Sequence, residues 1–402
     1  MLPLVANDPW LNPVADAVTA RHTRFEDRMN AIQGGFGSLK SFASAYQFLG
    51  FNYDSRRRGW WYREWAPAAH FLALMGDFNG WDRYSCPLEN IGNGIWEIFL
   101  PDSEYATRLV HGSKLKVVVQ SQIGEHERIP VYIRRVIQDE GNKDFAGQFW
   151  NPVTPYIFTH DAPKPTDEPL LIYEAHVGMA QEKEAVGSYA EFTANILPRI
   201  KADGYNAVQL MAVAEHPYYG SFGYHVSNFF APSSRFGTPE ELKELVDTAH
   251  GMGLRVIMDL VHSHTVKNIR EGINLFDGSD GQYLRAGERG NHTLWDSKIF
   301  DYGKTETLQF LLSNVRYWLE EFRFDGFRFD GVTSMMYLDH GIGVTFDDPW
   351  KYFGENVDNE AVTYLQLANR LCHQLNPDAI TIAEDVSGMP CLLYTSPSPR
   401  DS

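Results

Sequence analysis

The sequence predicts a multidomain protein in which an all-β sandwich is followed by part of a (β/α)8 barrel. Residues 41–160 contain short aromatic-rich runs separated by Gly, Asn, Asp and Pro, a pattern typical of antiparallel strands and turns. Residues 170–390 instead alternate strand-like and helix-like segments, which favours a parallel sheet. The proline-rich segment 161–169 indicates a linker between the two parts.

Two further segments flank these parts. Residues 1–40 are expected to form a helical arm, because apolar side chains recur at helical spacing over 14–29, and the helix is expected to stop at Gly34 and Gly35. Residues 391–402 do not continue the alternation of strand-like and helix-like segments and consist mostly of small and polar residues with Pro and Ser. We interpret them as a non-native tail on a fragment, with an ordinary disordered tail as the alternative.

Five strands are expected in the barrel portion. They are residues 170–177, 206–213, 255–261, 326–330 and 379–385. Capping boxes at Ser188 with Glu191 and at Thr238 with Glu241 predict the starts of two intervening helices. A barrel is favoured over a doubly wound sheet, because no glycine-rich phosphate turn follows the first strand.

The charge and composition of the chain exclude several classes of function. The chain has 52 acidic and 35 basic residues, and its net charge of -17 has the wrong sign for binding nucleic acid or anionic membranes. No run of about 18 apolar residues predicts a membrane span. Three widely spaced cysteines indicate neither a disulfide framework nor a zinc cluster. We therefore expect a soluble, cytoplasmic, monomeric protein without nucleic-acid or membrane partners.

Polar side chains at the ends of the barrel strands are the candidates for chemistry, because barrel active sites lie at the carboxyl ends of the strands. The candidates are Asp259, His262 and His264 on the third strand, Arg328 and Asp330 on the fourth, and Glu384 and Asp385 on the fifth. Two carboxylates on neighbouring strand ends suit glycosidic bond chemistry, about 5 to 5.5 Å apart in a retaining enzyme. Asp330 and Glu384 are the natural pair, and rim ion pairs are the alternative.

The phrase FRFDGFRFD contains two candidate aspartates. A short turn after the preceding helix places Asp325 at the strand entrance and Asp330 at its exit, with Arg328 on the same strand face as Asp330. The adjacent Arg328 is expected to keep Asp330 ionised, as a carboxylate nucleophile requires. Asp325 is interpreted as a turn residue.

A metal site is the less favoured interpretation of the third strand end. Asp259, His262 and His264 could together bind a metal. The remaining histidines show no complementary spacing. We therefore expect neither a metal nor an organic cofactor.

Several segments resemble the alpha-amylase family of glycoside hydrolases. DLVHSH (259–264), GFRFDGVTSMMY (326–337) and AEDVSG (383–388) are similar to three of its four signature regions. IYEAHVGM, SFGYHVSNFFAPSSRFGTPEELK and WDSKIFDYG resemble more specifically the 1,4-alpha-glucan branching enzymes of the glycogen and eukaryotic starch type. GDFNGW (76–81) and HGSKLKV (111–117) resemble the family-48 carbohydrate-binding module.

The resemblance implies a role for each matching residue. It implies that Asp330 is the nucleophile, that Glu384 is the general acid/base, that Asp259, His264, Arg328 and Tyr224 contact the glucosyl unit, and that Trp81 and Lys116 hold glucan on the module. The implied partner is an alpha-glucan such as glycogen, amylose or amylopectin. The implied reaction cleaves alpha-1,4 chains and re-attaches them through alpha-1,6 linkages by a retaining double displacement.

The resemblance ends at Pro390, before the fourth signature region and the last three barrel strands. We therefore expect this chain by itself to be inactive, with the first and fifth strands at open edges of the sheet. Two alternatives to a branching enzyme remain. One is an amylase-like or debranching alpha-glucan hydrolase, in which water is the acceptor. The other is a non-catalytic glucan-binding protein.

Overall fold

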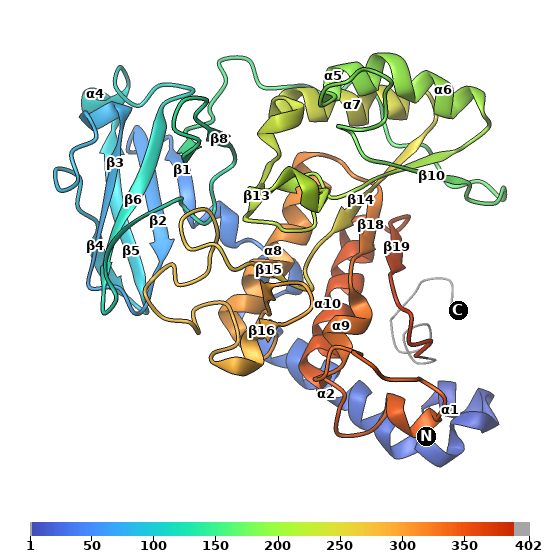
Figure 1. The fold of residues 1–402 in the computed structure, drawn as a ribbon. Helices are drawn as coiled ribbons and strands as arrows, with labels where there is room; N and C mark the ends of the chain where they lie inside the picture. The colour runs from blue at the N-terminus through green and yellow to red at the C-terminus, as the bar shows by residue number, and fades with distance from the viewer. Residues whose placement is uncertain (1, 390–402) are drawn as a thin grey trace.

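The structure is a computed structural model that describes residues 2–389, so the expected tail at 391–402 lies outside the described residues. Figure 1 shows a layered β-region beside a second region in which helices surround a five-stranded sheet. The N-terminal helices lie next to this second region (Figure 1). None of the described helices is long and apolar enough to cross a membrane.

Helices form the N-terminal arm, and they extend further than the sequence predicts. They are α1 (Pro3–Asn7), η1 (Pro9–Val14), α2 (Ala15–Phe36), α3 (Leu39–Phe42) and η2 (Ala45–Gln47). The expected stop at Gly34 and Gly35 is wrong, since α2 continues through both residues. It ends at Gly37, whose φ of 77° is a conformation that glycine adopts without strain. Arg24 and Arg28 join α2 to Asn359 and to the Gly303 carbonyl.

Two antiparallel sheets form the sandwich between Gly50 and Gln148. One has the order β1-β2-β5-β4, and the other has the order β3-β6-β9-β8 with β7 paired to β6. The strands are β1 (Gly50–Asp54), β2 (Gly59–Trp65), β3 (Phe71–Gly76), β4 (Glu89–Gly92), β5 (Ile95–Pro101), β6 (Lys114–Ser121), β7 (Gly124–Arg128), β8 (Val136–Gln138) and β9 (Phe145–Gln148); the short helices η3 (Asp77–Asn79) and α4 (Asp102–Tyr105) lie between them. Buried side chains of both sheets, including Tyr62, Leu72, Leu100 and Val117, belong to one hydrophobic core.

All five predicted barrel strands are present and parallel. They are β10 (Ile172–Ala175), β11 (Ala207–Leu210), β14 (Arg255–Leu260), β18 (Gly326–Phe329) and β19 (Ile380–Ala383), and they are neighbours in that order. This sequential order is that of a barrel segment, because a doubly wound sheet reverses its strand order at a switch point. Strands β10 and β19 form the two edges of this sheet.

Helices and short strands connect the barrel strands. They are α5 (Tyr189–Glu191), η4 (Phe192–Ile196), α6 (Leu197–Ala202), β12 (Ala214–Glu215), η5 (Tyr219–Ser221), β13 (Asn228–Pro232), η6 (Ser234–Phe236), α7 (Pro239–Gly251), β15 (Thr265–Val266), η7 (Glu288–Gly290), β16 (Asn291–His292), β17 (Ser297–Lys298), α8 (Thr305–Glu321), α9 (Val332–Met336), η8 (Pro349–Tyr352) and α10 (Asn359–Leu375). Both predicted capping boxes are confirmed, at Ser188 and at Thr238. The helix after Ser188 widens into a π-turn at η4, just before Pro198, because proline cannot donate the helical hydrogen bond.

The segment between the two regions is tied to α7 by one buried carboxylate. Asp247 accepts hydrogen bonds from Tyr156 Oη at 2.8 Å, from Thr159 N at 2.9 Å and from His160 N at 2.8 Å. These bonds hold the pKa of Asp247 well below its usual range in spite of burial, which acts in the opposite direction. The sandwich and the barrel portion are therefore joined by more than a flexible linker.

A close approach of backbones at Gly326 sets the spacing between β18 and β19. Gly326 has a φ of 154°, and a Cβ atom at this position would collide with the carbonyl oxygen of Ile380. The parallel register starts with this pair and ends with Phe329 opposite Ala383. The next residues in each strand therefore leave the sheet side by side.

Substituting this glycine should separate the two strands. We expect Gly326→Ala to lower the free energy of unfolding by at least about 2 kcal/mol, because the methyl group meets backbone and the residue keeps an unfavourable φ. The control is Gly343→Ala, which also changes a glycine with a positive φ, of 70°, but has open space around its Cβ. Urea denaturation of both variants tests this prediction, and equal losses would show that the β18–β19 spacing does not depend on Gly326.

Candidate active site

The strand ends bring four of the predicted residues together. Asp259 lies in β14 and Arg328 lies opposite it in β18, in direct register. Asp330 directly follows β18, and Glu384 directly follows β19. Tyr224 reaches the same place from the loop between η5 and β13.

The Arg328 guanidinium contacts three carboxylates from three neighbouring strands. Its Nη1 lies 3.0 Å from Asp259 Oδ2 and 3.2 Å from Asp330 Oδ1, and its Nη2 lies 3.2 Å from Glu384 Oε1. Only the planar fork of arginine reaches several carboxylates at fixed angles in this way. The three negative charges raise the pKa of Arg328, although burial acts against the rise.

Asp259 is buried, and each of its carboxylate oxygens has a partner within the protein. Its Oδ2 also accepts from Tyr224 Oη at 2.6 Å, and its Oδ1 accepts from Gln209 Nε2 at 2.8 Å. Burial raises its pKa to about 6, although the Tyr224 hydroxyl and Arg328 favour the ionised form. Sequence reasoning missed Gln209 and its second partner Glu174, at 3.2 Å. The available signal was a polar side chain within each of two otherwise apolar strands.

Asp330 is a buried carboxyl with a raised pKa. Burial and the negative charges of Glu384 and Asp259 raise the pKa of Asp330 to about 7, against the charge of Arg328. The expectation that the adjacent Arg328 keeps Asp330 ionised at neutral pH is therefore wrong, because burial and the neighbouring carboxylates outweigh the charge of Arg328.

Glu384 has one further contact, which orients it. Its Oε2 accepts from the backbone N–H of Gly331 at 2.7 Å, while 43% of its side chain stays exposed. Asp330 is much less exposed, at 13%. The more exposed carboxyl is therefore the one that faces solvent, and the buried carboxyl sits between it and Asp259.

The two histidines after β14 differ in their surroundings. His262 contacts the Tyr364 hydroxyl through Nδ1 and Asn314 Oδ1 through Nε2, so both of its ring nitrogens are used within the core. His264 is buried, and its Nδ1 has no hydrogen-bond partner within residues 2–389. Burial lowers the pKa of His264 to about 3, so the ring is neutral. In the described part of the chain, no group of three or more His, Cys, Asp or Glu could hold a metal ion.

The two remaining candidate carboxylates hold backbone turns. Asp325 accepts from Val256 N at 2.6 Å and contacts His250 Nε2 at 2.8 Å, which fixes the entrance of β18 to β14 and α7. Asp385 accepts from Thr333 Oγ1 at 2.7 Å and from Ser387 N at 2.9 Å. Neither carboxylate contacts Arg328.

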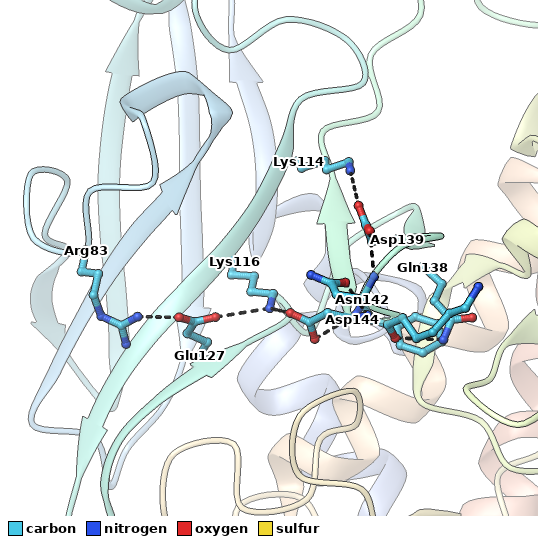
Figure 2. A network of polar contacts seen from close by, with 10 residues as sticks. Arg83, Lys114, Lys116, Glu127, Gln138, Asp139, Asn142 and Asp144 are labelled. Carbon is cyan, nitrogen blue, oxygen red and sulfur yellow. Dashed lines mark hydrogen bonds and ion pairs between the residues drawn. The ribbon is translucent and has the colours of Figure 1, made fainter.

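On the sandwich, Trp81 and Lys116 line one hollow of about 340 Å³. Trp81 is 37% exposed, and its indole N–H donates to Asp77 at 2.9 Å. Lys116 is buried, and Figure 2 shows its ammonium between Asp144 at 2.6 Å and Glu127 at 3.3 Å. Lys116 therefore orders this face through two ion pairs, and a ligand reaching it must compete with them.

Comparison with known proteins assigns both regions to families. Residues 48–133 match the family described as carbohydrate-binding module 48 (isoamylase N-terminal domain), and residues 193–283 match the alpha amylase catalytic domain. The fold is similar to the catalytic module of the multi-modular glycogen-degrading pneumococcal virulence factor SpuA, with a TM-score of 0.66 over 87% of this chain and 52% of that one. At 18% identity, this likeness shows the fold alone. The fold and the two matches thus indicate a carbohydrate-binding module followed by part of an alpha-amylase catalytic domain.

Within that family, the chain is most informatively compared with 1,4-alpha-glucan-branching enzymes, to which about half of its residues are identical. It is 52% identical over 96% of its length to the 1,4-alpha-glucan-branching enzyme of Emericella nidulans, and 50% identical over 97% to that of Equus caballus. It spans 57% and 56% of those two relatives.

The raised pKa of Asp330 predicts a pH-dependent effect of its removal. Between the usual aspartate pKa of about 3.9 and a folded value of about 7, the folded state binds more protons than the unfolded state, so stability falls as pH rises. We expect Asp330→Asn to be more stable than the wild type by about 1 to 2 kcal/mol at pH 8, and to have no such advantage at pH 4. Urea denaturation across this range measures the difference.

The control for this measurement is Asp167→Asn, which changes an exposed carboxylate of the linker segment. Its stability should follow the wild-type pH curve. A constant difference between Asp330→Asn and the wild type from pH 4 to pH 8 would mean that Asp330 keeps an ordinary pKa.

Proposed function

We propose that this chain carries the catalytic centre of a 1,4-alpha-glucan branching enzyme, with Asp330 as nucleophile and Glu384 as general acid/base. The observation that carries the proposal is the contact of Arg328 with both carboxyls at the ends of adjacent parallel strands. The identity of about half to branching enzymes supports the choice of reaction within the family.

In the first step, a carboxylate oxygen of Asp330 attacks the anomeric carbon of an alpha-1,4-linked glucosyl unit. The bond from that carbon to the leaving oxygen breaks, and Glu384 gives this oxygen its proton. This step requires Glu384 to carry a proton when the substrate is bound. Asp330 remains the anion because Arg328 neutralises it once the bound sugar separates the two carboxyls.

In the second step, the ionised Glu384 removes the proton from a 6-hydroxyl group of a glucan chain. The resulting oxygen attacks the anomeric carbon and displaces Asp330, which leaves an alpha-1,6 linkage and restores both carboxyls. Positive charge develops on the sugar ring in each step. Three carboxylates around a single guanidinium leave a net negative site, which stabilises that charge.

Three further residues would bind the glucosyl unit. Tyr224 offers a ring beside Asp259, Asp259 would accept hydrogen bonds from sugar hydroxyls, and His264 has an unpaired ring nitrogen near the site. On the module, Trp81 is the exposed aromatic that would stack on an alpha-glucan such as glycogen, amylose or amylopectin. The Lys116 ammonium, which lies between Asp144 and Glu127, would then donate a hydrogen bond to the glucan.

Linkage analysis of the products tests this function in the full-length protein. With amylose as substrate, we expect new alpha-1,6 linkages with few new reducing ends. We expect Asp330→Asn and Glu384→Gln each to reduce the rate at least about 1000-fold, because both residues act in the bond-breaking step. The control Glu104→Gln changes an exposed carboxylate of the sandwich and should keep wild-type activity.

The same assay separates the alternatives. New reducing ends without alpha-1,6 linkages would identify an alpha-glucan hydrolase. Co-sedimentation with glycogen, without turnover of amylose, would identify a non-catalytic glucan-binding protein.

A further inference from the structure

The loop after β14 returns to the catalytic face as a small antiparallel sheet. Strand β15 directly follows His264 and pairs with β17, which in turn pairs with β16. The turn at residues 293–296 joins β16 to β17, so it is tied to the end of β14. The tip of this turn holds two apolar side chains, the exposed Leu294 and the partly exposed Trp295.

Trp295 reaches the backbone beside the two carboxyls. A Cβ atom added to Gly331 would lie only 3.1 Å from Trp295 Cη2. Gly331 directly follows Asp330, and its N–H is the group that holds Glu384. The ring centroids of Trp295 and His264 are 5.0 Å apart. The indole therefore lies against the backbone residue whose N–H orients the acid/base.

Neighbouring groups hold this indole in place. The ring of His292 stacks on it with a centroid distance of 4.0 Å and an interplanar angle of 9°, and Trp295 N donates to His292 Nδ1 at 3.2 Å. Burial lowers the pKa of His292 to about 4, so this stack is uncharged. The indole N–H has no hydrogen bond to any residue in the described chain.

We propose that Trp295 is a substrate-positioning residue that holds the acceptor glucan beside Glu384 and favours its hydroxyl group over water. The proposal rests on the proposed function and deepens it. A flat indole can stack on the apolar face of a glucosyl ring, and its unpaired N–H can donate to a sugar hydroxyl.

The position of Trp295 relative to Glu384 determines which glucan chain the indole can contact. Tyr224 touches Asp259, whereas Trp295 borders the peptide that orients Glu384. Glu384 protonates the leaving chain and later deprotonates the acceptor, so a sugar stacked on Trp295 lies where those two chains bind in turn. A chain held there also occupies the space from which water would attack the glucosyl-enzyme.

The test uses two substitutions of Trp295 in the full-length protein. Trp295→Leu keeps an apolar side chain but removes the flat ring, and Trp295→Phe restores a ring. The matched control is Trp10→Leu, because Trp10 is 90% exposed on the N-terminal arm. With amylose as donor and a maltooligosaccharide as acceptor, the measured quantities are the acceptor KM, kcat, and the number of alpha-1,6 linkages formed per new reducing end. The Tm of each variant is measured alongside.

We expect Trp295→Leu to raise the acceptor KM about 10-fold, which corresponds to about 1.4 kcal/mol, and to shift products toward new reducing ends. Trp295→Phe should recover part of both effects, and Trp10→Leu should match the wild type. An unchanged KM and product ratio in Trp295→Leu would overturn the inference while leaving the proposed function intact. A fall in Tm and kcat that Trp295→Phe does not relieve would equally overturn it, since it would indicate a structural role. Absence of alpha-1,6 linkages from the wild type would overturn the proposed function and the inference together.

Discussion

The guanidinium of Arg328 binds carboxylates at the ends of three neighbouring parallel strands. Arg328 lies 3.0 to 3.2 Å from carboxylate oxygens of Asp259, Asp330 and Glu384, which come from β14, β18 and β19. These carboxylates are brought together by the sheet, and without a shared cation their mutual repulsion would oppose the sheet that positions them. The strand order, the close backbone approach at Gly326 and the burial of the site all bring these carboxylates within reach of Arg328.

The site contains one guanidinium and three carboxylates, so its negative charge is not fully neutralised. This excess of negative charge has a catalytic use. Burial raises the pKa of Asp259 to about 6 and that of Asp330 to about 7, because one arginine cannot fully compensate several carboxylates in a poorly hydrated place. These raised pKa values bring the titration of Asp259 and Asp330 close to neutral pH, which is common for carboxyls in catalytic sites. Functional sites commonly sacrifice stability in this way.

Much of the fold follows from local sequence pattern, whereas the long-range contacts do not. The five strands, the two helix capping boxes and the distinction between Asp325 and Asp330 were predictable. Short stretches of sequence are enough to indicate strands, turns and helix starts. The path of α2 through Gly34 and Gly35 was not, since packing outweighs the low helix propensity of glycine. Three other features were equally hidden: the engagement of Lys116 by Asp144, the sharing of Arg328 among three carboxylates, and the place of Trp295. Each depends on the pairing of segments that are distant in the chain.

The stability of Arg328→Gln as a function of pH tests most directly whether this guanidinium holds the three carboxylates together. At about pH 3 Asp259 and Asp330 are protonated in the wild type, so little charge is left for Arg328 to compensate and the variant should lie close to the wild type. Above about pH 7 the variant leaves three carboxylates without their cation, and its deficit in unfolding free energy should grow by at least about 2 kcal/mol. A deficit that stays the same from pH 3 to pH 8 would contradict the account, because it would mean that Arg328 contributes packing rather than charge.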